Sequence, residues 1–174
     1  MTGRIKKLPG KIKAPLSIGR NQISWKFAIW SFFSSSLSIW SLLWITNWSG
    51  HSLLIGSFGA TAVLLFSAPD SPLSQPRNLV GGHLISSLVA VILVATLGTS
   101  TFSIGLAVGL SIFLMYLTHT LHPPGGATAL IGVTGGVGYE FIFMPVMLGV
   151  LILLVNAILV NNFVHHRKYP KVWF

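Results

Sequence analysis

The chain has 174 residues, of which 52% are hydrophobic and only 7% are charged, and its mean hydropathy is +0.78. Soluble globular domains carry roughly 25% charged residues, so this chain has too few to cover a surface that faces water. The composition therefore excludes a soluble domain and predicts an integral membrane protein that is surrounded by the lipid bilayer.

The net charge of +9 is concentrated at the two ends of the chain. Seven of the eleven basic residues precede residue 27, three follow residue 166, and only Arg77 lies between. Cytoplasmic segments of membrane proteins are enriched in lysine and arginine. We therefore expect a cytoplasmic arm at residues 1–26 and a cytoplasmic tail at residues 165–174. No basic face with interleaved aromatic residues lies between them, so nucleic-acid binding is not expected.

Three apolar runs follow the basic arm. Residues 27–46 and 79–98 each have the roughly 20 mainly apolar residues that a helix needs to span the bilayer. The run between them, residues 53–67, contains the sequence IGSFGATAVLLF and is too short for a confident full span.

The loop at residues 68–78 reads APDSPLSQPRN and carries the only aspartate of the chain. We expect Asp70 and Arg77 to pair and brace a rigid cytoplasmic turn. In the alternative interpretation, Arg77 collects anions at the membrane surface.

The second half of the chain repeats this order. Residues 104–121 and 142–164 are long enough to span, and the shorter run at 123–137 begins with PPGGATALIGV. The sequence Gly-Ala-Thr-Ala occurs at 59–62 and again at 126–129, an offset of 67 residues.

This repetition predicts an all-α membrane protein, a polytopic helical bundle with one transmembrane domain at residues 27–164. Its two repeats cover residues 27–98 and 104–164, and each has a long, a short and a long segment. If the short segments at 53–67 and 123–137 cross, three crossings per repeat invert the second repeat, as in many transporters. Four spans with two re-entrant segments are the alternative.

The prolines and glycines of the short segments predict helix starts inside the membrane. Pro123 and Pro124 lack a backbone N–H and fit in the first turn of a helix. A helix start leaves N–H groups without partners and attracts anions. We therefore expect a small-anion site where the two starts meet. The predicted binding residues are Ser57, Gly59, Ala60, Thr61, His122, Pro123, Pro124, Gly125, Gly126, Ala127 and Thr128. In the alternative interpretation, these small residues only pack helices together.

Other polar residues of the spans have a structural interpretation. Four serines of the first span, at 31, 34, 38 and 41, share one helix face; we expect them to pack helices rather than to line a pore. Asn156 should form a hydrogen bond between helices. His119 and His122 lack further ligands for zinc, and the chain has no cysteine, no carboxylate pair and no Ser-His-Asp pattern. We therefore expect no metal, no cofactor and no catalysis.

Two long motifs, THTLHPPGGATAL and GATAVLLFSAPDSPLSQPRNLVGGHLISS, resemble the HPP family of small integral membrane proteins. The resemblance covers residues 25–165, and the family takes its name from the motif at residues 122–124. Members are usually described with four transmembrane helices, and those of cyanobacteria and chloroplasts are implicated in nitrite transport. The resemblance implies a nitrite carrier or channel; a non-transporting scaffold in a larger complex is the alternative. We expect a bacterial or cyanobacterial inner membrane, because the N-terminal arm does not resemble a chloroplast transit peptide. We also expect a homo-oligomer, because neighbouring subunits would cover the ends of the short helices.

Overall fold

The computed structural model describes residues 24–50, 52, 54–163 and 167–173, and the regular structure within them is all helical. Most of the predicted arm at residues 1–26 and part of the tail at 165–174 lie outside the described residues. The helices are α3 (Trp25–Ser49), α4 (Ser57–Ser67), η1 (Pro72–Ser74), α5 (Pro76–Leu97), α6 (Thr101–Leu117), α7 (Pro123–Thr134), the π-helical η2 (Ile142–Met147) and α8 (Leu148–Phe163).

Local signals set the ends of these helices. Proline occupies the first turns of α5 and α7, where a missing N–H costs nothing. The side chain of Ser100 caps α6 and forms a reciprocal capping box with Ser103. Helix α3 ends at Gly50, whose φ of 71° is easily adopted only by glycine.

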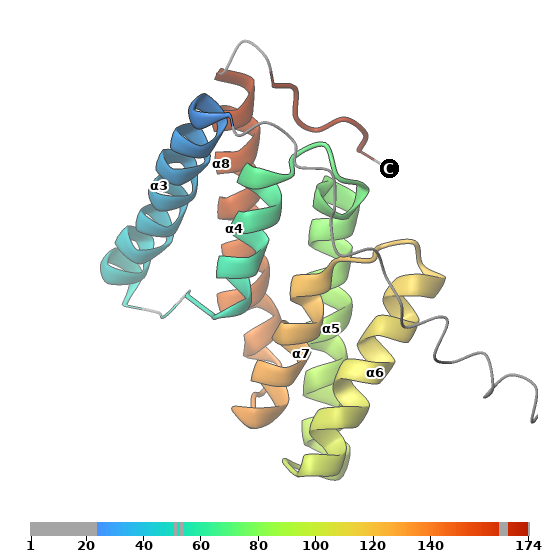
Figure 1. The fold of residues 1–174 in the computed structure, drawn as a ribbon. Helices are drawn as coiled ribbons and strands as arrows, with labels where there is room; N and C mark the ends of the chain where they lie inside the picture. Colours follow the sequence, from blue (N-terminus) through green and yellow to red (C-terminus); the bar gives the residue numbers. More distant parts are fainter. Residues whose placement is uncertain (1–23, 51, 53, 164–166, 174) are drawn as a thin grey trace, which may run out of the picture.

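The six α-helices alternate in direction along the chain (Figure 1). In the view of Figure 1, α3, α5 and α7 run downward, while α4, α6 and α8 run upward. The start of α3, the end of α8 and residues 167–173 consequently lie at the same end of the bundle. This alternation agrees with six consecutive crossings, whereas the inverted relation of the two repeats remains a prediction.

The helices form two packed groups. Helices α5, α6 and α7 pack closely against one another, and α3 packs against α4 and α8. Contacts of α4 with α7 and of α5 with α8 join the groups. There are two apolar cores, one around Phe58 and Leu153, which also includes Leu79 of α5, and the other around Ala90 and Val133. The surface between the ends of the bundle exposes large apolar side chains such as Trp44 and Phe113, as expected for a protein in lipid.

The predicted pattern of long and short segments is largely confirmed. Three helical stretches are long and apolar enough to cross a membrane: Trp25–Trp48, Pro76–Leu97 and Ile142–Phe163. The short segments predicted at 53–67 and 123–137 are the helices Ser57–Ser67 and Pro123–Thr134. The span predicted at 104–121 is instead a helix of 17 residues that ends at Leu117. The chain turns there, and His119 has a φ of 55°, which a helix cannot contain.

Polar contacts between helices confirm two expectations and correct a third. The side chain of Asn156 donates to Oγ of Ser41 at 2.8 Å, linking α8 to α3. Three of the four serines of α3 donate to backbone carbonyls of their own helix, and the fourth donates to the carbonyl of Phe66 in α4, so this face packs helices. The predicted pair of Asp70 and Arg77 is wrong. Asp70 instead pairs with Lys171 at 3.0 Å, and the guanidinium of Arg77 reaches the end of α6.

Candidate functional site

The two short helices meet through their hydroxyl side chains. The Oγ atoms of Ser57, the first residue of α4, and of Thr128 in α7 are 2.8 Å apart. One turn further along α4, Oγ1 of Thr61 lies 3.2 Å from Nε2 of His122, the residue that precedes α7. The start of each short helix therefore contacts the other helix, and all four side chains are buried.

His83 of α5 lies between these groups. Its Nε2 is 2.9 Å from Oγ1 of Thr61, and its Nδ1 is 2.8 Å from Oγ1 of Thr128. The rings of His83 and His122 are 5.0 Å apart, and Nδ1 of His122 donates to the carbonyl of Leu73 at 2.8 Å. We call Ser57, Thr61, His83, His122 and Thr128 the His–Thr cluster.

Two glycines allow α7 to approach α5 closely enough to form this cluster. A Cβ atom added to Gly82 would lie 2.5 Å from Cβ of His122. One added to Gly125 would lie 2.8 Å from Oγ of Ser86 and 2.9 Å from the carbonyl of Gly82. Side chains at either position would therefore push the two helices apart.

A hydroxyl group with no partner among the described residues borders the cluster. Ser86 lies one turn beyond His83, is fully buried and makes no hydrogen bond among the described residues. Its Oγ points at the first turn of α7, as the short distance to Gly125 shows. A buried polar group without a partner is unusual and often marks a place for a ligand or a water molecule.

The structure brings together only part of the predicted binding residues. Ser57, Thr61, His122 and Thr128 belong to the His–Thr cluster, and Pro124 and Gly125 are buried beside it. Gly126 is half-buried, while four predicted residues face outward: Gly59, Ala60, Pro123 and Ala127.

Backbone amides contribute less than the sequence predicts. The amide of Gly125 donates to the carbonyl of His122 at 2.8 Å, and those of Phe58 and Gly59 donate to the turn before α4. These three amides therefore have partners within the protein, and the predicted binding of an anion by backbone amides stays a prediction. Side chains, rather than free N–H groups, dominate the place where the two short helices meet.

Sequence analysis missed His83, although a signal was present. It is the only titratable residue within the apolar run 79–98, and an ionisable residue inside a membrane span is by default a functional candidate. His119 and His122 do not share a site, because His119 is exposed at the turn while His122 is buried.

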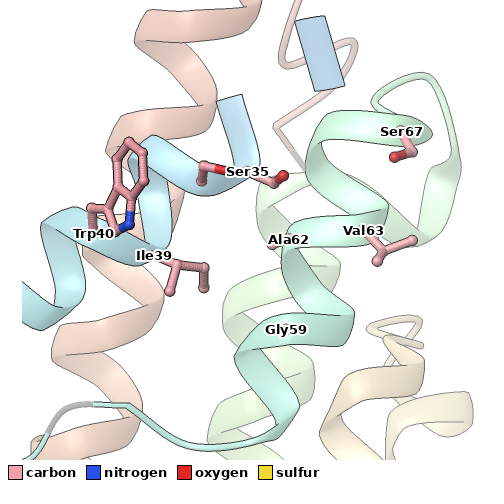
Figure 2. Close-up of a pocket in the computed structure, with 8 residues that line it drawn as sticks. Ser35, Ile39, Trp40, Gly59, Ala62, Val63 and Ser67 are labelled. Atoms are coloured by element: carbon pink, nitrogen blue, oxygen red, sulfur yellow. The ribbon is translucent and has the colours of Figure 1, made fainter. Parts of the chain in front are cut away.

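A separate groove lies on the outer side of α4. Figure 2 shows this open groove, whose volume is about 390 Å³, between α3 and α4. Its walls include Ser35, Trp40, Gly59 and Val63. Gly59 is the only predicted binding residue in its lining, and none of the His–Thr cluster lines it. We therefore place the candidate site at the cluster rather than in the groove.

Comparison with known proteins identifies the family of the chain. A family described as "HPP, transmembrane region" matches residues 20–170. The chain belongs to the HPP transmembrane family. It is thus an integral multi-pass membrane protein, and the motif that carries the family name supplies His122 of the cluster.

Two transmembrane proteins of Dictyostelium discoideum are similar to this HPP chain. One is 51% identical over 130 residues, which cover 70% of this chain and 46% of the relative. The other is 42% identical over 181 residues, which cover 97% of this chain and 57% of that relative. The chain thus spans about half the length of the curated relatives it matches. No solved structure matches the chain.

Proposed function

We propose that this HPP protein transports a small monovalent anion across its membrane, and that nitrite is the first substrate to test. The choice of nitrite rests on the family resemblance, and the choice of an anion rests on the chemistry of the His–Thr cluster. The positions of the basic residues further support cytoplasmic termini, whereas the proposed bacterial or cyanobacterial inner membrane does not rest on them.

The observation that carries the proposal is the burial of the His–Thr cluster inside an apolar bundle. His83, His122, Thr61 and Thr128 are all fully buried. Polar and ionisable groups inside a membrane are costly and are kept where they serve transport or binding. Packing alone would not require two histidines at one point.

The cluster has the chemistry expected for a small anion. Threonine hydroxyls and imidazole N–H groups donate hydrogen bonds to an anion. Neither lysine nor arginine contributes to the cluster, so an anion would be held weakly enough to leave again, as passage requires. Ser86 adds a free hydroxyl beside the start of α7, where the helix dipole favours negative charge.

Access to the cluster requires the two short helices to separate. The groups of the cluster bond directly to one another, so a bound anion replaces at least one of these hydrogen bonds. Rigid-body movement of one half of a transporter against the other is a common way to open such a site. The division of the bundle into two packed groups, with the α4–α7 contact at their junction, suits this movement.

Nitrite uptake into proteoliposomes tests the proposal. The wild-type protein should take up nitrite faster than protein-free vesicles, and Thr128→Val should raise KM about 2- to 10-fold, because one neutral hydrogen bond contributes about 0.5–1.5 kcal/mol. Thr134→Val is the matched control, since Thr134 is on the same helix but exposed, and its hydroxyl binds only its own backbone. Absence of flux above the protein-free rate would instead favour a non-transporting scaffold.

A further inference from the structure

The His–Thr cluster is a continuous row of hydrogen bonds. It begins at the carbonyl of Leu73 in η1, passes through His122, Thr61 and His83, and reaches Thr128. From Thr128 it continues to Ser57, the first residue of α4, whereas η1 follows the last residue of that helix. The row therefore runs beside α4 between the two ends of that helix, which Figure 1 shows next to α5 and α7.

When the cluster is uncharged, its hydrogen-bond donors and acceptors determine which atom carries each proton. The carbonyl of Leu73 can only accept, so Nδ1 of His122 carries a proton and its Nε2 accepts from Thr61. The oxygen of Thr61 then accepts from Nε2 of His83. Nδ1 of His83 is left to accept from Thr128, whose single proton is thereby used.

The orientation of Thr128 fits a second arrangement. Its hydroxyl is also placed to donate to Oγ of Ser57 at 2.8 Å and to the carbonyl of Pro124 at 3.3 Å. When it does so, Nδ1 of His83 must donate to Thr128, and the cluster holds one additional proton. If His83 then passes its Nε2 proton to the oxygen of Thr61, and Thr61 passes its own proton to Nε2 of His122, the positive charge moves from His83 to His122.

The cluster has room for one additional proton and not for two. Two charged imidazoles would stand with ring centres only 5.0 Å apart, and like charges at such a distance repel. Thr61 would also have to accept from both rings while its own proton found no acceptor in the cluster.

No other titratable group on the packed helices can balance this charge. Helices α4, α7, η2 and α8 contain no titratable residue. Besides His83, α5 carries only Arg77, which binds a carbonyl at the end of α6. Helix α6 carries only Tyr116, whose side chain is 71% exposed, and His119 in the next turn is exposed.

The loop that contains η1 does not supply a balancing charge either. Its only acid, Asp70, pairs with Lys171 at 3.0 Å. The hydroxyl of Tyr169 from the C-terminal segment donates to the carbonyl of Ser74. The single charge of a protonated cluster therefore has no counter-ion among the described residues that pack around it.

We propose that the His–Thr cluster binds one proton together with each anion, so that the protein is an electroneutral one-to-one proton–anion symporter. This inference rests on the proposed function and adds the proton as a second transported substrate. Burying an unpaired charge is very costly, whereas a paired one is tolerated. The proton attracts the anion and the anion stabilises the proton, so each binds well only when the other is present.

The test measures initial nitrite uptake by full-length protein in proteoliposomes. Nitrous acid crosses lipid unaided, so the rate in protein-free vesicles is subtracted. At zero membrane potential, lowering the external pH by one unit should raise the rate by up to about tenfold. A potassium diffusion potential at equal pH should leave the rate unchanged, and a pH-sensitive dye inside the vesicles should report one proton per nitrite.

Two outcomes separate the proposals. Flux that follows the membrane potential and ignores the pH gradient would overturn proton coupling and leave anion transport standing. Absence of protein-dependent flux under every condition would overturn both.

Variants locate the proton. His83→Gln and His122→Gln each replace one of the two rings that can carry the proton with a side chain that cannot titrate, so each should reduce acid stimulation and the double variant should abolish it. His119→Asn is the matched control, because asparagine tolerates the positive φ at that position, and it should keep full stimulation. If nitrous acid itself were the substrate, both glutamine variants would keep acid stimulation, and the inference would be overturned. If neither variant assembles, Thr61→Val decides, because it removes the hydroxyl that joins the two imidazoles: loss of acid stimulation supports the inference, and unchanged acid stimulation overturns it.

Discussion

Thr61 and Thr128 stand 67 residues apart, at equivalent positions of the two short helices, and each binds one nitrogen of His83. A single imidazole thereby connects two helices that run in opposite directions. The hydrogen bonds fix the ring in one orientation, so His83 is poised between two hydroxyls rather than free to turn.

Gly82 tests how closely α5 and α7 must pack for this arrangement. Gly82→Ala would place a Cβ atom 2.5 Å from Cβ of His122, which is too close without a shift of the backbone. We expect a loss of about 1–3 kcal/mol in stability, as for other overpacked interiors, and a clear fall in thermal melting temperature in detergent. Gly126→Ala is the control, because its Cβ would meet only a methyl group of Val108 at 4.0 Å. Equal melting temperatures for the two variants would contradict the close approach.

The sequence predicted four of the five residues of the His–Thr cluster but not His83. Thr61, Thr128, Ser57 and His122 could be named because the repeat and the proline pair marked two helix starts. His83 could not be found in this way, since it lies mid-helix and only tertiary packing brings it between the two threonines. The outward direction of Gly59 and Ala60 likewise depends on how α4 is rotated within the bundle.

At the level of elements, the C-terminal segment ties the loop around η1 to the end of α8. The buried hydroxyl of Tyr169 donates to the carbonyl of Ser74 at 2.7 Å, and burial raises the pKa of Tyr169, so this hydroxyl stays protonated in neutral solution. Gln75 accepts from the backbone amide of Lys171 at 2.8 Å. Leu73, which holds His122, directly precedes the anchored Ser74.

Tyr169→Phe should loosen this segment. The change removes one buried hydrogen bond, which contributes about 0.5–1.5 kcal/mol, and leaves the carbonyl of Ser74 without that donor. We expect faster cleavage of the C-terminal segment by trypsin at its basic residues, with little change in the melting of the bundle. Tyr139→Phe serves as the control, because Tyr139 is 74% exposed. Cleavage rates that match for both variants would show that the segment is held by other contacts.

The number and order of the elements were more predictable than the residues at which they end. Apolar runs and prolines gave six segments in the correct order, because span length and the missing N–H of proline act locally. The early end of α6 at Leu117 was missed, since the following residues are still partly apolar and the positive φ of His119 becomes evident only in three dimensions.

For the whole molecule, we predict six crossings, which would place the loop at residues 68–78 and the start of α6 on opposite sides of the membrane. The chain has no cysteine, so single cysteines introduced by Ser71→Cys and Thr101→Cys report topology directly. We expect the first to be labelled by an impermeant maleimide only from the cytoplasmic side and the second only from the other side. Labelling of the Ser71→Cys protein from the outside would exclude six crossings and favour four spans with two re-entrant segments.

We further predict a homo-oligomer. Gly105 and Gly109 have the spacing of a close helix contact, and the structure leaves open space beyond both. Native mass spectrometry in a detergent that preserves transport should give a multiple of the 18.8 kDa subunit. A monomeric mass in a preparation that still transports would refute the prediction.

The position of a bound anion tests the central claim most directly. Bromide is a monovalent anion that can be located by anomalous X-ray diffraction. Crystals of transport-competent protein grown with bromide should show an anomalous peak in contact with Thr61, His83 or Thr128, and Thr128→Val should weaken that peak. Bromide found only elsewhere, in a preparation in which bromide inhibits nitrite uptake, would contradict the assignment of the His–Thr cluster as the anion site.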